Sequence, residues 1–139
     1  MYTLKTEAAF DSAHFLSGYE GKCRNIHGHR WRVVAEILSD RLVDSGQERG
    51  MLVDFSQFKK VLKEEADILD HALIIEKGSL PDELYNMLCG NQFRIISLEF
   101  RPTAENLSEY FYRQLSGRGF RVKEVCVYET PNNCAAYSE

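Results

Sequence analysis

Alternation between apolar and polar residues is the clearest pattern in the first forty positions of the chain. Residues 2–14 alternate in this way, and residues 31–38 are rich in branched and aromatic side chains. Both properties are typical of β-strands, in which successive side chains point to opposite faces of a sheet. We therefore predict two paired strands, the first ending at His14 and the second opening near His27.

A helical period follows from residue 54 onward. Apolar residues then recur at the spacing of an amphipathic helix, at Phe55, Phe58, Val61, Leu62 and Leu69. Asp54 precedes the first of them and is a suitable N-cap, so we predict a helix that ends near residue 70. A second helix is predicted after Thr103, which can cap it, and this helix ends at residues 116–117.

Shorter segments complete the fold. Residues 78–90 are compatible with a loop or a short helix, and residues 93–100 with a short strand. Two further strands are predicted at residues 120–130 and 134–137. The order ββααββ indicates an α+β fold in which two helices cover one face of an antiparallel sheet. At 44% apolar content, the whole chain (residues 1–139) is expected to form one domain.

Charge excludes some classes of partner. The formal net charge is −4, and no run of like charges occurs. This argues against nucleic acid or a membrane as the main partner. The sequence has neither a signal peptide nor a long apolar run, so we expect a soluble protein in the cytoplasm.

Histidines provide the first chemical signal. Three of the four, His14, His27 and His29, lie within sixteen residues of one another. Residues two apart on a strand share a face, so the imidazoles of His27 and His29 can converge on one point. His14, at the end of the neighbouring strand, can supply a third. Neutral imidazoles suit Zn²⁺, and three protein ligands with an open position are typical of catalytic zinc. An isolated His-x-His pair is more often ordinary, but the third histidine favours the metal site.

Cys23 lies four residues before His27, in a polar loop that also contains Lys22 and Arg24. Two roles are open to its thiol. It can close the zinc shell as a fourth, structural ligand, or it can stay off the metal as an acid/base activated by nearby cations. Closed structural zinc sites usually contain more than one thiolate, so the open site is favoured.

Asp70 and His71 stand where the first predicted helix ends. An acid beside a histidine at the end of an element is the arrangement expected of an imidazole that transfers protons. For a bare pair, the simpler interpretation is that Asp70 caps a turn and His71 packs in the core. Neighbours in sequence need not touch, so both interpretations remain open.

Several short motifs together cover nearly the whole chain. They are Cys23-x-x-x-His27-Gly-His29 with His14 upstream, Leu69-Asp70-His71, Pro102-Thr103-Ala-Glu105-Asn, and Val127-Tyr128-Glu129-Thr130. In this order they resemble the 6-pyruvoyltetrahydropterin synthase and 6-carboxytetrahydropterin synthase family. The resemblance implies the tunnelling fold, in which the sheets of several subunits join into a barrel, commonly as trimers stacked into a homohexamer.

The resemblance also implies roles for single residues: zinc ligands at His14, His27 and His29, and a proton-transfer triad of Cys23, Asp70 and His71. Glu129 would anchor the pterin ring, because a carboxylate can accept two hydrogen bonds from an aminopyrimidine edge. Thr103 and Glu105 would help to line the pterin pocket, although a helix cap explains Thr103 equally well.

The spacing of the first motif distinguishes two branches of the family. Three residues separate Cys23 from His27, which resembles the carboxy-type enzymes of queuosine biosynthesis. That branch implies a lyase that converts 7,8-dihydroneopterin triphosphate into 6-carboxy-5,6,7,8-tetrahydropterin, acetaldehyde and triphosphate. One departure is that residues 76–101 are longer than the family pattern leads us to expect.

Three alternatives remain. Two are enzymes of the same family: a pyruvoyl-type synthase and an aldolase that cleaves the dihydroneopterin side chain. The third is a structural module in which Cys23 and the three histidines close around zinc. The residues that bind the triphosphate are not identifiable, and Lys22, Arg24, Arg30 and Arg32 are candidates on charge alone.

Overall fold

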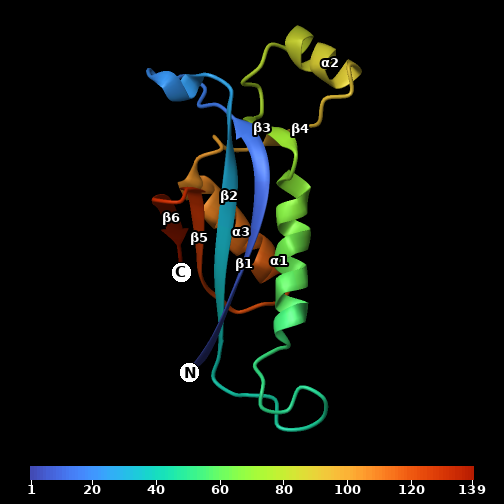
Figure 1. Cartoon of the computed structure of the whole chain (residues 1–139), viewed down its shortest axis with the longest axis vertical. Coiled ribbons are helices and arrows are strands. Elements are labelled where there is room, and N and C mark those ends of the chain that lie inside the picture. Colours follow the sequence, from blue (N-terminus) through green and yellow to red (C-terminus); the bar gives the residue numbers. More distant parts are fainter.

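The computed structural model describes all residues 1–139 and is organised around one long antiparallel ribbon (Figure 1). Strand β1 (Tyr2–His14) pairs along its whole length with β2 (His27–Ser39). The register places Tyr2 opposite Ser39 and His14 opposite His27. Both predicted strands are therefore confirmed, and their pairing brings the histidines to one end of the ribbon.

A six-stranded sheet is built outward from this ribbon. On one side, β5 (Val122–Thr130) pairs antiparallel with β2, and β6 (Asn133–Tyr137) pairs with β5. On the other side, β3 (Ala72–Glu76) and β4 (Ile95–Leu98) add parallel strands, in the order β4-β3-β1-β2-β5-β6. The antiparallel sheet is confirmed, and the two short parallel strands extend it.

Two helices cover one face of the sheet, as predicted (Figure 1). Helix α1 (Phe55–Leu69) begins after Asp54, whose carboxylate accepts a hydrogen bond from the backbone N–H of Ser56. Helix α3 (Ala104–Gly117) begins after Thr103, whose hydroxyl accepts from the N–H of Asn106. These side chains satisfy N–H groups that have no partner within the helix, so both caps stabilise the helix starts.

A third helix, α2 (Asp82–Gly90), stands away from the sheet at one end of the molecule (Figure 1). It has no buried residue. Residues 78–90, for which the sequence allowed either a loop or a short helix, therefore contain a helix. None of the helices is long and apolar enough to cross a membrane.

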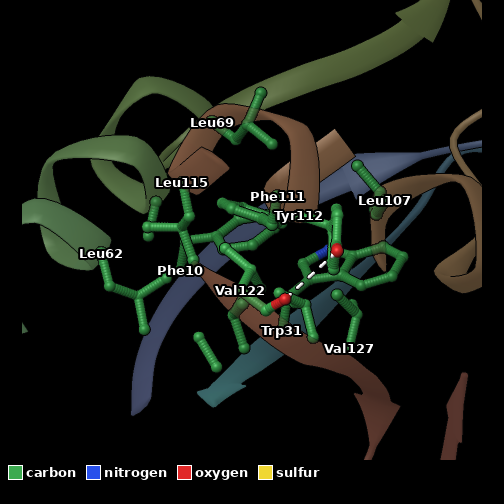
Figure 2. Close-up of a cluster of buried hydrophobic side chains, with 14 of the residues drawn as sticks. Phe10, Trp31, Leu62, Leu69, Leu107, Phe111, Tyr112, Leu115, Val122 and Val127 are labelled. Atoms are coloured by element: carbon green, nitrogen blue, oxygen red, sulfur yellow. Dashed lines mark hydrogen bonds between the residues drawn. The ribbon is translucent and has the colours of Figure 1, made fainter. Parts of the chain in front are cut away.

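The hydrophobic core lies between the sheet and helices α1 and α3 (Figure 2). Trp31 and Phe10, from neighbouring strands, are both fully buried and their rings stack at 5.9 Å. The Trp31 ring also lies edge-on to His14 at 4.9 Å and to His29 at 5.4 Å. Core packing therefore fixes the orientation of two of the histidines, because a buried ring in a close-packed interior cannot turn freely.

Candidate functional site

Four side chains converge at the end of the β1–β2 ribbon. Alternation along β1 points Phe10, Ser12 and His14 into the molecule, and the pairing of the strands brings His27 and His29 to the same face. The ligand atoms of the three histidines and Glu129 all lie within 4.8 Å of one another. Glu129 comes from β5, so three neighbouring strands supply the cluster.

Backbone carbonyls orient two of the imidazoles. His14 donates through Nδ1–H to the carbonyl of Pro102 at 2.8 Å, and His27 donates through Nδ1–H to the carbonyl of Asn25 at 2.7 Å. A carbonyl can only accept, so the proton must be on Nδ1, and a neutral ring then has its lone pair on Nε2. Ligand histidines in metal sites are commonly held by this second hydrogen bond.

The two free Nε2 atoms face each other. The Nε2 atoms of His14 and His27 are 3.1 Å apart, and an oxygen of Glu129 lies 3.3 Å from Nε2 of His14. Lone pairs and a carboxylate at such distances repel unless a proton or a cation lies among them. Burial is the main cause of a lowered pKa for His14 and also for His29, which disfavours the protonated rings. A metal cation is therefore the group that fits.

The dimensions agree with such an ion. Four ligands at the roughly 2.0–2.1 Å of a zinc–nitrogen bond would be about 3.3 Å from one another in a tetrahedron. The His14–His27 separation of 3.1 Å is close to this value, as are the distances of 3.3 and 3.5 Å from Glu129 to His14 and His29, and all the ligand atoms lie within 4.8 Å of one another. In addition, Nε2 of His29 is buried and has no hydrogen-bond partner. Buried polar atoms rarely lack a partner, so a bound ligand would explain this one. This group of residues could therefore hold a metal ion.

Glu129 also faces a small cavity beside the cluster. The cavity has a volume of about 180 Å³, and its walls include Thr103, Glu105 and Glu129. The three residues expected to contact the pterin are thus brought together, although they come from α3 and β5. Besides Ala104, four other residues of the wall were not predicted from the sequence: Leu16 from the loop after β1, and Asn133, Cys134 and Ala135 from β6. Nothing local in the sequence identifies them, because they reach the cavity only through the folding of β6 and the loop after β1.

The segment that precedes α3 supports the site at several points. Pro102 supplies the carbonyl that orients His14, and Thr103 caps the helix. Arg101 donates through Nε and Nη2 to the carbonyl of Ser17, at 3.2 and 2.6 Å. Residues 101–103 therefore contact the histidine group, the small cavity and the loop after β1.

Cys23 lies in that loop, within a single turn of 3₁₀ helix (Lys22–Arg24). Its backbone carbonyl accepts from the N–H of Leu16 at 2.9 Å, which closes the loop. Its thiol is half-buried and is not part of the group of converging ligand atoms. The thiol of Cys23 therefore lies outside the group formed by the three histidines and Glu129.

Asp70 and His71 do touch. Nδ1–H of His71 donates to Oδ2 of Asp70 at 2.8 Å, while Oδ1 of Asp70 accepts from the N–H of Asp11 at 2.8 Å. The Asp11 N–H is the main cause of a lowered pKa for Asp70, and the His71 hydrogen bond adds to it. An ionised carboxylate therefore orients the imidazole, whose Nε2 faces outward on a side chain that is 79% exposed.

The dyad and the metal group line different cavities of the chain. His71 lies on a cleft of about 590 Å³ formed by β1, β3 and the segment around Phe93 and Arg94. Glu129 and His29 instead border a cavity of about 440 Å³, together with Arg30 and other residues of β2 and β5. Within one chain, His71 of the dyad and the histidine–Glu129 group therefore do not share a pocket.

The candidate anion-binding residues differ in their availability. Arg30 pairs with Asp11 at 3.0 Å, and Arg32 pairs with Glu7 at 2.9 Å. Lys22 and Arg24, beside Cys23, form no ion pair. Their charges remain free for an anion, whereas the charges of the two strand arginines are already balanced.

Comparisons with known proteins identify relatives along the whole chain. The family model for 6-pyruvoyl tetrahydropterin synthase matches residues 3–139. The 6-carboxy-5,6,7,8-tetrahydropterin synthase of Haemophilus influenzae is 31% identical over 142 residues and covers 100% of both chains. The relative of that name from Synechocystis is 33% identical over 138 residues, covering 99% of this chain and 93% of its own.

Solved structures show the same fold. An uncharacterized protein from Wolinella succinogenes has a TM-score of 0.78 at 21% identity, covering 99% of this chain and 98% of its own. The 6-pyruvoyl tetrahydropterin synthase of Plasmodium falciparum has a TM-score of 0.70 at 20% identity, with coverages of 99% and 97%. The sequence match and the arrangement of the site lead to one conclusion: the chain belongs to the 6-pyruvoyl tetrahydropterin synthase family.

Proposed function

We propose that this chain is a zinc-dependent 6-carboxy-5,6,7,8-tetrahydropterin synthase that acts on 7,8-dihydroneopterin triphosphate in queuosine biosynthesis. The observation that carries the proposal is the pair of Nε2 atoms of His14 and His27, 3.1 Å apart with both Nδ1 protons donated to carbonyls. That arrangement needs a cation. The names of the curated relatives and the Cys23–His27 spacing support the carboxy-type branch.

His14, His27 and His29 are the proposed zinc ligands. When bound there, zinc would act as a Lewis acid toward the side-chain oxygens of the substrate. The pterin ring is proposed to lie in the small cavity with its aminopyrimidine edge on Glu129. A carboxylate offers two acceptor oxygens to that edge, and Thr103 and Glu105 line the same cavity.

Proton transfer is assigned to Cys23 and to the Asp70–His71 dyad. In the dyad, the Asp70 carboxylate accepts Nδ1–H of His71, so the free Nε2 can take a proton and return it. Cys23 would act as the second acid/base, with Lys22 and Arg24 as adjacent cations. The ring is reduced at the expense of the side chain, so no redox cofactor is required.

We further propose that the working enzyme is a homohexamer in which two subunits complete each site. Two observations support this. The dyad and the metal group line different cavities of one chain. In addition, β1 is covered by β3 only at Ser12 and Ala13, and β6 has a free outer edge, so backbone groups are left for pairing with other subunits.

The decisive experiment is product analysis by mass after incubation of the zinc-loaded protein with 7,8-dihydroneopterin triphosphate. The proposal predicts 6-carboxytetrahydropterin with equimolar acetaldehyde. A 6-pyruvoyl product would assign the chain to the other branch. A 6-hydroxymethyl pterin, formed when the two outer side-chain carbons leave as an aldehyde, would indicate an aldolase. If no product forms, a structural zinc module would be favoured.

A further inference from the structure

Helix α1 ends without a cation of its own. No basic residue lies in its last turn, although the last carbonyls of a helix have no partner within it and carry the negative end of the helix dipole. Arg94, the residue immediately before β4, occupies this position. Its guanidinium donates through Nη2 to the carbonyl of Ile68 at 2.6 Å and through Nη1 to the carbonyl of Asp70.

These carbonyls belong to the turn that carries the dyad. His71 has a φ of +50°, in the left-handed region that residues other than glycine rarely adopt. Such a conformation persists only when surrounding contacts hold it. The N–H of His71 donates to the carbonyl of Asp11 at 2.7 Å, and the N–H of Asp11 donates to Asp70 at 2.8 Å. The Ser12 hydroxyl donates to the carbonyl of Leu69, and Arg94 adds its two hydrogen bonds to the carbonyls of Ile68 and Asp70.

Arg94 is itself held at both ends. Its backbone carbonyl accepts from the N–H of Leu73 in β3 at 3.0 Å, while its side chain reaches back to α1. The Asp70–His71 turn is therefore clamped between a strand and a helix terminus. Arg94 and His71 also line the same cleft. A guanidinium suits this position because its planar fork can donate to two carbonyls at once, which a lysine cannot reproduce.

We propose that Arg94 is a positioning residue for proton transfer: it holds the Asp70–His71 turn so that His71 keeps its Nδ1–H on Asp70 and presents Nε2. This inference rests on the proposed function of the dyad. It also assigns a role to residues 76–101, the segment that is longer than the family pattern, because Arg94 belongs to it. Without the clamp, the two carbonyls return to water and the turn can relax out of the left-handed region.

The test compares Arg94→Ala and Arg94→Lys with wild type in the zinc-loaded enzyme. Arg121→Ala is the matched control, because Arg121 pairs with Asp40 beyond the opposite end of β2. Zinc content and thermal unfolding show whether each variant is intact. Turnover of dihydroneopterin triphosphate gives kcat and KM, and ¹³C NMR of labelled histidine reports the tautomer of neutral His71, assigned by its absence in His71→Gln.

We expect Arg94→Ala to keep zinc and KM near wild type while kcat falls by about tenfold to 10²-fold, the scale of a misplaced catalytic group. His71 should then populate the Nε2–H tautomer. Arg94→Lys should recover part of kcat because one of the two hydrogen bonds can form. Since the lysine variant keeps a charge at the helix end, it remains informative if the alanine variant is too unstable to study.

Two outcomes would overturn the inference: wild-type kcat with an unchanged His71 tautomer in both variants, or a loss of stability alone with kcat unchanged. The tautomer readout is independent of substrate. If wild type fails to turn over dihydroneopterin triphosphate but Arg94→Ala still shifts the tautomer, the positioning role stands and the proposed reaction fails. If wild type is active and neither quantity changes, only the positioning role fails.

Discussion

Nε2 of His14 lies 3.1 Å from Nε2 of His27, and each ring donates its Nδ1–H to a backbone carbonyl. Two neutral imidazoles held in this way turn lone pairs toward each other. This arrangement could hold a cation, and the buried Nε2 of His29, which has no hydrogen-bond partner, could supply a third nitrogen ligand. The proposed metal site therefore depends on the hydrogen bonds to Pro102 and Asn25 as much as on the histidines themselves.

The first prediction concerns the metal. Wild type should bind about one zinc per chain, and His27→Ala or His29→Ala should reduce this at least about tenfold, as measured by elemental analysis. His71→Ala is the control, because that histidine lies outside the group, and it should keep its zinc. Full zinc occupancy in both ligand variants would contradict the assignment.

As the pH is lowered, zinc should be released only below the ordinary pKa of histidine. Zinc binds the neutral imidazole, so protonation competes with binding. Burial lowers the pKa of His14 and of His29, which keeps both rings neutral as the pH falls. We expect zinc to remain bound at the ordinary histidine value of about 6.5 and to leave only at lower pH. A chelator-competition titration measures this, and release above pH 7 would contradict it.

Glu129 is predicted to bind pterin rather than to hold the zinc. Glu129→Gln should keep zinc but weaken binding of a pterin product by roughly tenfold or more, because a charge-assisted pair becomes a neutral one. Glu124→Gln, at an exposed position on the same strand, is the matched control. Calorimetry and zinc analysis give the two readouts. Parallel loss of zinc would instead make Glu129 the fourth ligand.

Cys23 separates chemistry from metal binding. Cys23→Ala should leave zinc content, oligomer and pterin binding nearly intact, because its thiol lies outside the converging group. Turnover should nevertheless fall by roughly 10²-fold or more, the usual scale for a positioned acid/base. Cys89→Ala, on the protruding helix α2, serves as control. An active Cys23 variant would leave the dyad as the only proton-transfer group.

Assembly can be tested by complementation. Sedimentation should show a hexamer, and a monomer at micromolar concentration would exclude a shared site. Inactive Cys23→Ala and His71→Ala subunits, co-expressed with different tags, should regain activity if each site combines residues of two subunits. Random mixing would leave about a quarter of such sites with both native residues. A triad formed within one chain predicts no recovery.

Asp70 is expected to contribute stability that depends on pH. The Asp11 N–H and His71 lower its folded-state pKa, so the contribution is present above the unfolded value of about 3.9 and is lost as pH falls through the folded value. Asp70→Asn should thus be less stable at pH 6, by up to about 1 kcal/mol for a carboxylate that water partly screens. The gap should narrow below about pH 4, and denaturant unfolding of both proteins across pH measures it.

Local patterns were sufficient for most of the fold. Alternation and residue type predicted β1, β2, β5 and β6, and three- and four-residue spacing predicted α1 and α3 with their caps, because these signals come from the geometry of a single element. Strand β3 was not predicted. The secondary structure of residues 78–90 and 93–100 could not be predicted from these patterns. A short apolar run fits either a buried strand or part of a helix, and only pairing with β3 made Ile95–Leu98 a strand.

The candidate site divides in the same way. The sequence alone placed His27 and His29 on one face and made His14, Glu129 and the Asp70–His71 pair candidates, since residue type, spacing and resemblance are all local information. Only the tertiary structure set His14 opposite His27, joined His14 to Pro102 across 88 positions of sequence, and brought Arg94 to the turn at Asp70 across 24. Contacts of this kind depend on strand register and helix packing, and a hydrogen bond between distant segments leaves no periodic trace in either one.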